Sequence, residues 1–214
     1  MNHSMRTLLV ATALTFGGTR LHAQADIPYL AKGNVELNGF VGAAAGGGNT
    51  SLGAGGNLAV AVHRNVMPYV EYSYFPGSLG ASLNVMNPIG GTNDVALATG
   101  KAARQDFHGG VHLRFPIGRS KIVPYAAFGV GALFISSAKG TIVVPVGNGT
   151  TRTFDTTLPS ETETAVNFGG GIRIYTKENF GLRLEVKGYR PVSGNYVRDT
   201  FMKATVGFFW YSKK

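Results

Sequence analysis

Charged side chains recur at every second position inside several apolar segments of the chain. Glu185 stands between Arg183 and Lys187 in the run Leu-Arg-Leu-Glu-Val-Lys at 182–187, and Glu71 lies between Val70 and Tyr72. Side chains two residues apart on a β-strand share a face, so such charges gather on one side of a sheet. The residues with this phase are Glu36, Glu71, Arg114, Arg173, Arg183, Glu185 and Lys187. Because both signs are present, we expect an enclosed ion-pair network.

Histidines are the other side chains that could take part in catalysis or metal binding. His108 and His112 are four apart and share the face that carries Arg114 on one segment, whereas His63 falls in a turn. No serine and carboxylate are visible beside them at one height, as a nucleophilic site requires. Two histidines without a third ligand also make a poor metal site. We therefore expect no catalytic residue, no metal and no cofactor.

The segments that carry these charges are apolar on their other side, which faces away from the charges. That side comprises Val35, Leu37, Val41, Ala43, Leu58, Val60, Val62, Val70, Tyr72, Tyr74, Val111, Leu113, Phe115, Val166, Phe168, Ile172, Ile174, Leu182, Leu184, Val186, Met202, Ala204, Val206, Phe208 and Trp210. In a membrane, the opposite phase would expose Arg or Lys to hydrocarbon at about 2 to 4 kcal/mol each. The pattern predicts strands with an apolar outer face and a charged lumen. A fifth segment, 124–135, is apolar on both faces, and its Gly129 and Gly131 indicate either close packing or a bend.

Connections between the segments alternate between short and long. Short turns are expected at 63–67, 116–122 and 176–180, and long connections at 44–56, 76–105, 136–163 and 190–199. The Gly-rich runs 46–48 and 53–56 fit a flexible connection, since no Lys-Ser or Lys-Thr follows as in a phosphate loop. In the third long connection, 141–146 and 150–156 flank Gly147-Asn148-Gly149, which predicts a hairpin. Short turns at one end and long loops at the other are typical of an outer-membrane barrel. The fold class predicted for residues 34–214 is all-β, an eight-stranded antiparallel up-and-down transmembrane β-barrel.

The N-terminus has the pattern of a cleavable secretion signal. Arg6 precedes an uncharged stretch from Thr7 to Thr19, and Ala23-Gln24-Ala25 offers small residues for cleavage. The stretch is shorter than the roughly 17 to 25 residues of a membrane anchor helix. We expect a signal peptide at 1–25 and a periplasmic lead at 26–33, with the protein in the cell outer membrane.

Composition limits the partners. The formal charge of +9 is spread along the chain, which argues against a nucleic-acid patch. The basic residues either contact phosphates of lipopolysaccharide or anionic lipid, or are simply solvated. The chain has no cysteine, so neither disulfides nor a cysteine metal site is expected.

Aromatic residues cluster beside the short turns. Tyr69, Tyr125, Phe208 and Trp210 lie near the expected periplasmic strand ends. Such rings favour membrane interfaces, where the body is buried and the polar edge is wet. The alternative is core packing in a soluble barrel.

Several segments resemble the eight-stranded outer-membrane barrels of the OmpA-like and OmpX-like kind, also called the outer membrane protein beta-barrel domain or porin family. The resemblance covers 34–211 and rests on Met-Pro-Tyr-Val-Glu-Tyr at 67–72, Val-Pro-Tyr-Ala-Ala-Phe-Gly-Val-Gly-Ala at 123–132, Phe-Gly-Leu-Arg-Leu-Glu-Val-Lys-Gly-Tyr at 180–189 and Ala-Thr-Val-Gly-Phe-Phe-Trp at 204–210. It implies that the barrel-assembly machinery reads the aromatic last strand. Here Tyr211-Ser212-Lys213-Lys214 follow Trp210.

The expected function is a monomeric outer-membrane barrel with a structural, membrane-integrity or surface-interaction role. Its expected partners are outer-membrane lipid and lipopolysaccharide, the assembly machinery, and an extracellular partner that binds the loops. Three alternatives stay open: a small ion-conducting channel, a soluble periplasmic lipocalin-like carrier, and a lipid A-modifying barrel enzyme. The carrier requires the opposite burial, with an apolar lumen and charges in water.

Overall fold

The computed structural model describes residues 28–46, 49–86, 95–145, 151–177, 179–193 and 200–212, so the expected signal peptide lies outside the described residues. Its elements are the short 3-10 turn η2 (Pro28–Leu30) and the strands β1 (Val35–Gly46), β2 (Asn49–Val60), β3 (Val66–Met86), β4 (Val95–Arg114), β5 (Ile122–Ile135), β6 (Ala138–Pro145), β7 (Thr151–Leu158), β8 (Glu161–Lys177), β9 (Phe180–Pro191) and β10 (Phe201–Tyr211). No helix in the described part of the chain is long and apolar enough to cross a membrane.

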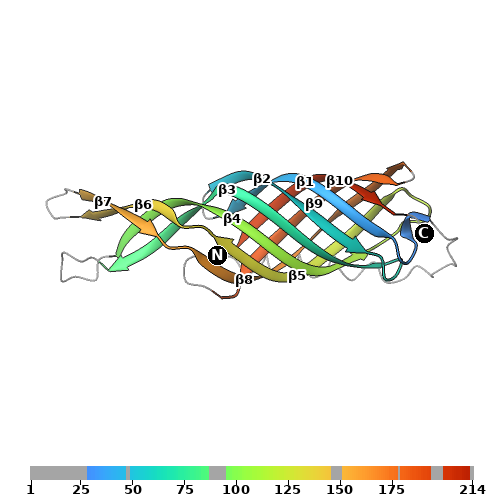
Figure 1. Ribbon diagram of the computed structural model, residues 1–214, viewed down its shortest axis with the longest axis horizontal. Coiled ribbons are helices and arrows are strands. Elements are labelled where there is room, and N and C mark those ends of the chain that lie inside the picture. The colour runs from blue at the N-terminus through green and yellow to red at the C-terminus, as the bar shows by residue number, and fades with distance from the viewer. Residues whose placement is uncertain are drawn as a thin grey trace, which may run out of the picture.

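Eight of the strands close into a barrel (Figure 1). β1, β2, β3, β4, β5, β8, β9 and β10 pair antiparallel in chain order, and β10 returns to pair with β1 from Glu36↔Tyr211 to Ala45↔Met202. Closure leaves the barrel wall without an unpaired edge. The predicted eight-stranded antiparallel barrel is confirmed.

Burial follows the predicted two-residue period. Glu36 is 2% exposed and Leu37 beside it is 59% exposed, and β10 alternates strictly along its whole length. None of the residues predicted to face outward is buried, whereas all the charged residues predicted to face inward are. A register slip of one residue would reverse both faces, so this alternation fixes the register.

The structure also resolves the phase of the fifth segment, which is β5. Tyr125 and Leu133 face the lumen, whereas Phe128 and Phe134 face outward. A Cβ atom at Gly129 would meet the Tyr69 hydroxyl, and one at Gly131 would meet the backbone and ring of His108. These glycines therefore mark close packing against bulky lumen neighbours.

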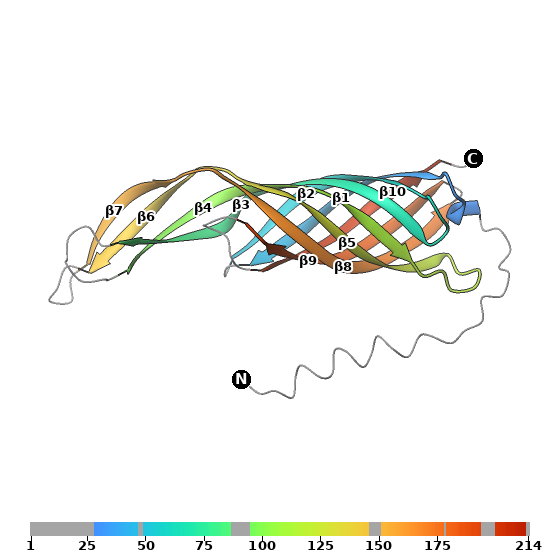
Figure 2. The ribbon, with the colours of Figure 1, turned by 90° about the horizontal axis from the view of Figure 1, so that it is seen from below.

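The three short turns lie together at one end of the barrel, which we call the turn end (Figure 2). They connect β2 to β3, β4 to β5 and β8 to β9, and the first is closed by the bridge His63↔Val66. All three were predicted.

The glycine-rich segment 44–56 is not a loose connection, which corrects the prediction. β1 continues to Gly46 and pairs with β2 from Asn49 onward. A Cβ atom at Gly55 would meet the ring of Phe40, and one at Gly53 the ring of Phe75. The missing side chains make room for these lumen aromatics, so the glycines belong to the wall.

The segment 76–105 is likewise mostly strand. β3 runs on to Met86 and pairs with β4 from Val95. The register shifts between Phe75 and Leu79, and Gly77 in this bulge has φ +60°. A bulge accommodates Pro76, which has no N–H to donate, so the proline does not end the strand.

A four-stranded sheet continues beyond the barrel at the end opposite the turns (Figures 1 and 2). β6 and β7 form the predicted hairpin, with Ala138↔Leu158 at its base. β6 also pairs with β4 from Leu97↔Val143 to Gly100↔Gly140. We call the sheet formed by 79–86, 95–102, β6 and β7 the extension sheet.

The η2 turn closes the turn end. Leu30 is buried in a cluster with Val123, Tyr175, Phe209 and Tyr211. The Tyr29 ring stacks on that of Tyr175 at 4.3 Å, and its hydroxyl donates to the Ser120 carbonyl. Burial raises the pKa of the Tyr29 hydroxyl, so it keeps this proton. We call residues 28–30 the cap; the expected periplasmic lead therefore packs into the barrel where it is described.

Candidate functional site in the barrel lumen

The centre of the lumen is organised around one carboxylate. Glu71 of β3 accepts hydrogen bonds from Arg183 at 3.1 Å, Lys187 at 2.9 Å and Lys203 at 2.8 Å, which come from β9 and β10. All four side chains are at most 1% exposed. Charge-assisted bonds from these three cations saturate Glu71 and tie both strands to β3 across the lumen.

A second carboxylate lies beside the first. Glu185 is 3.4 Å from Arg183 and 3.0 Å from Lys187, so these two cations bridge Glu71 and Glu185. The Tyr125 hydroxyl donates to Glu185 at 2.7 Å. The predicted residues of β3 and β9 thus form one continuous network.

Glu36 and Arg173 form a separate pair. The Arg173 Nε donates to Glu36 Oε2 at 3.0 Å, and its Nη2 lies 2.9 Å from His112 Nδ1. The guanidinium also lies 4.2 Å from the centroid of the Tyr125 ring. Through His112 and Tyr125 this pair adjoins the Glu185 cluster.

Arg114 lies apart from the carboxylates. Its Nη2 donates to the carbonyls of Leu30 at 3.4 Å and His63 at 3.1 Å. The predicted network residue therefore holds the cap to the first turn.

Lys203 and Asp106 belong to the network but were not predicted. Lys203 donates to Ser73 at 3.1 Å and lies 3.3 Å from Asp106 Oδ2, and this same oxygen accepts from Ser73 at 2.7 Å. Asp106 fell just beyond a segment expected to be a loop, although Arg104, Asp106 and His108 continue the inward phase of β4. That two-residue spacing was the available signal.

Two of the four predicted interface aromatics face the lumen instead. Tyr69 and Tyr125 are each 4% exposed. The Tyr69 ring stacks on His112 at 4.1 Å, and that of Tyr125 lies 4.9 Å from it. Tyr69 is two residues from Glu71, and Tyr125 is two residues from Val123, so each ring shares the inward face of its neighbour. This alternation, and not the closeness to a turn, determines where the rings point. Phe208 and Trp210 do face outward, at 59% and 50% exposure.

These contacts fill the lumen at its centre. Glu71, Lys187 and His112 are each at most 1% exposed.

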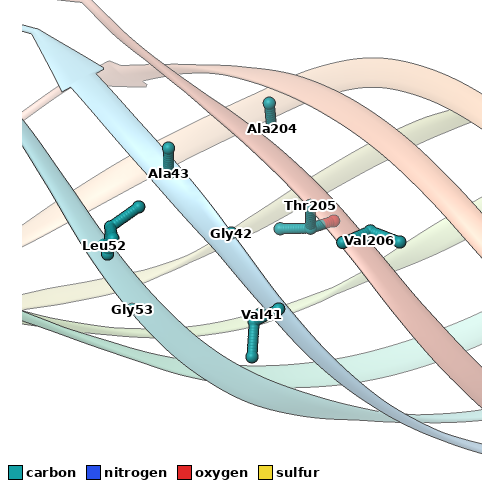
Figure 3. A pocket seen from close by; sticks show the side chains of 8 residues that line it. All are labelled: Val41, Gly42, Ala43, Leu52, Gly53, Ala204, Thr205 and Val206. Carbon is teal, nitrogen blue, oxygen red and sulfur yellow. The ribbon is translucent and has the colours of Figure 1, made fainter.

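An apolar groove of about 580 Å³ lies in the wall between β2, β1 and β10, lined by Val41, Gly42, Ala43, Leu52, Gly53, Ala204, Thr205 and Val206 (Figure 3). None of these eight lining residues is ionisable, so the groove itself offers no acid or base.

Ser73, Asp106 and His108 adjoin one another in an order unsuited to nucleophilic catalysis. The serine donates to Asp106, and His108 Nδ1 lies 3.4 Å from that same carboxylate. A nucleophile needs the imidazole next to it to take its proton. Across the described residues, no three His, Asp or Glu side chains gather as metal ligands.

No protein-family model and no curated protein matches the chain. Among solved structures, Neisserial surface protein A is similar over 83% of this chain and 95% of its own, with 10% identity and a TM-score of 0.50. The chain has the fold of the small outer-membrane β-barrels. Two others are the N-terminal β-barrel domain of OprF from Pseudomonas aeruginosa (14% identity, 85% and 98% coverage, TM-score 0.49) and Ail, the attachment invasion locus protein of Yersinia pestis (10%, 85% and 100%, 0.47).

Proposed function

We propose that this protein is a monomeric, non-enzymatic barrel of the bacterial outer membrane that strengthens the membrane and presents the extension sheet outside the cell. One observation carries the proposal. The wall is apolar outward, with Leu37, Val41 and Phe168 more than half exposed, while the ionisable side chains of the barrel strands are mostly buried inside. In water this arrangement would leave a broad apolar surface exposed, whereas in lipid it is stable.

The same observation opposes a soluble lipocalin-like carrier. Such a carrier needs an apolar cavity for its ligand and polar groups outside. Arg183, Glu71 and Lys187 occupy the place where that ligand would bind. The network also favours a structural lumen over an ion-conducting one, since ions would have to displace buried pairs.

Fractionation of cells that express the full chain tests the membrane placement. We expect the protein in the outer-membrane fraction, and a band that migrates differently on a denaturing gel before and after boiling. A soluble periplasmic protein without a boiling shift would contradict the proposal.

The extension sheet supports the surface-interaction part of the role. β7 pairs only with β6, and residues 79–86 of β3 pair only with β4, among the described residues. Two strand edges therefore carry backbone donors and acceptors that an extended partner segment would pair with. Four strands also make a stiffer platform than a two-stranded hairpin.

Replacement of residues 138–158 by a short Gly-Ser linker tests that role, because it removes β6 and β7 and leaves the eight barrel strands. We expect loss of adhesion to host cells or matrix with the boiling shift unchanged. A matched control replaces the turn 116–121 at the other end. Equal adhesion of wild type and hairpin deletion would end the surface-interaction proposal without affecting the membrane one.

Orientation follows from the same proposal. The turn end would face the periplasm, where the barrel-assembly machinery receives the last strand, and the basic turns would lie near anionic lipid. Lipopolysaccharide would surround the opposite half of the wall.

A further inference from the structure

Arg104 is a buried cation without a hydrogen-bond partner. Its side chain is 1% exposed, and none of Nε, Nη1 and Nη2 finds an acceptor. The guanidinium carbon lies 3.7 Å from the centroid of the Phe201 ring and 5.6 Å from that of Phe75. Aromatic rings hold the guanidinium in place while its five N–H groups stay unused, which is costly in a buried group.

Two further polar side chains adjoin this position. The Tyr189 ring stacks on Phe201 at 4.7 Å, and its buried hydroxyl has no hydrogen-bond partner. His108 meets the Tyr189 ring edge-on at 5.0 Å, and its Nε2 is also unpartnered. The Phe201 and Tyr189 rings thus form a chain of contacts that leads from the Arg104 guanidinium to the His108 imidazole.

The buried charges of the lumen do not balance. The buried acidic side chains are Glu36, Glu71, Asp106, Glu163 and Glu185, and the buried basic ones are Arg104, Arg114, Arg173, Arg183, Lys187 and Lys203. Among the described residues, the basic side chains thus outnumber the acidic ones by one. Asp106, two positions from Arg104, is already engaged by Ser73 and Lys203. A lumen with an excess of positive charge and unused donors attracts an anion.

We propose that Arg104, Tyr189 and His108 form a binding site for a small oxyanion, a phosphate or a carboxylate group. The planar guanidinium presents two parallel N–H groups that match two oxygens of such a group, and the phenol O–H supplies a third donor. The Phe201 ring forms an apolar floor that excludes water from one side of the site.

The site lies toward the end of the barrel opposite the turns. Arg104 pairs with Ile135, the last residue of β5, and with Phe75, the last residue before the bulge of β3. The Glu71 network lies deeper, toward the turn end. A ligand would therefore reach Arg104 without passing through the ion pairs.

Titration of the full chain in detergent micelles with inorganic phosphate, and separately with acetate, tests the site at constant ionic strength. The readouts are the NMR shift of the Arg104 Nε–H and the dissociation constant by calorimetry. We expect saturable binding of at least one probe, weakened by about tenfold or more in Arg104→Gln. Phosphate alone would mark a phosphate site, and both probes a general oxyanion site.

Two variants keep the test decisive. Tyr189→Phe removes only the hydroxyl and keeps the stack on Phe201, so it should fold and weaken binding by about threefold. Arg190→Gln removes one exposed positive charge from β9 and should leave binding unchanged. Unboiled gel migration verifies folding of each variant. Absence of saturable binding, or equal affinity in wild type, Tyr189→Phe and Arg104→Gln, would overturn the proposal.

Discussion

Glu71 is the residue on which the lumen depends most, because it neutralises three buried cations at once. We expect Glu71→Gln to lower the free energy of unfolding by about 3 to 5 kcal/mol, since Arg183, Lys187 and Lys203 would share too little negative charge. Urea unfolding of the protein in lipid vesicles, followed by the fluorescence of the single tryptophan, Trp210, measures this change.

Asp155→Asn is the matched control, since Asp155 is an exposed acid of β7 outside the barrel. It should shift the unfolding midpoint by no more than a surface substitution does, within about 0.5 kcal/mol. Equal midpoints for both variants would show that Glu71 does not hold the lumen together.

Trp210 also reports on the predicted aromatic interface. It is half exposed on the outer face of β10, one residue before the strand ends at the turn end. Interfacial tryptophans lie at headgroup depth. We therefore expect bromine close to the lipid headgroup to quench its fluorescence more strongly than bromine at the end of the acyl chain. Stronger quenching by the deep bromine would place this end of the barrel inside the membrane core.

Substitution of two glycines of the barrel wall distinguishes the effect of a steric clash on stability from the effect of a less flexible backbone. We expect Gly55→Ala to destabilise the barrel by about 1 to 3 kcal/mol, because the new methyl group would press on Phe40 and the Tyr72 carbonyl. Gly39→Ala meets nothing within 4 Å and should be neutral or slightly stabilising. Urea midpoints of both variants decide this, and an unaffected Gly55→Ala would contradict the close packing.

At the residue scale, the two-residue period identified most of the lumen charges from sequence alone. The two-residue period does not predict which charges form ion pairs. Partners such as Glu71 and Lys203 are 132 positions apart, and their relative positions along the barrel axis depend on how the strands are staggered. Closeness to a turn suggested an interface for Tyr69 and Tyr125, although Tyr69 shares the phase of Glu71 and Tyr125 lies on the strand whose phase the sequence left open. Their contacts with His112 decide for the lumen.

At the scale of elements, the extension sheet gives the clearest test of orientation. An epitope inserted between β6 and β7 should be labelled by antibody on intact cells. The same epitope placed in the turn 116–121 should be labelled only after the outer membrane is permeabilised. The reverse pattern would mean that the barrel is inserted in the opposite orientation. Labelling of both epitopes on intact cells would indicate a leaky membrane.

Strand boundaries were harder to predict than strand faces. Pro76 and Gly77 looked like the end of a strand, but the bulge between Phe75 and Leu79 absorbs them and pairing resumes. Glycines at 53 and 55 looked like a linker because sequence cannot show that Phe75 and Phe40 occupy the space beside them. β5 lacked polar residues to set its phase, and neighbours on β3, β4 and β8 set it instead.

For the molecule as a whole, the filled lumen and the cap predict a closed barrel. We expect the purified protein in planar lipid bilayers to give no resolvable unitary current steps, because Glu71, Arg183 and Lys187 fill the centre and the Leu30 cluster packs at the turn end. Boiled protein serves as the control for incomplete folding. Uniform steps from the folded form alone would support the channel alternative.

The overall architecture was the most predictable level. Alternation over eight segments and the unequal connections leave few folds besides a closed barrel. What sequence could not provide was the continuation of β3 and β4 into the extension sheet, which depends on their pairing with β6.

The cap has a consequence for the order in which the chain is completed. Leu30 precedes every strand in the sequence, yet it is buried by Phe209 and Tyr211 of β10, the last strand, together with Val123 and Tyr175. This side chain is therefore synthesised before all the residues that bury it, and its burial is complete only when β10 is in place. Full burial of Leu30 therefore requires that the last strand has joined the barrel, so solvent protection of this one side chain reports on a completed molecule.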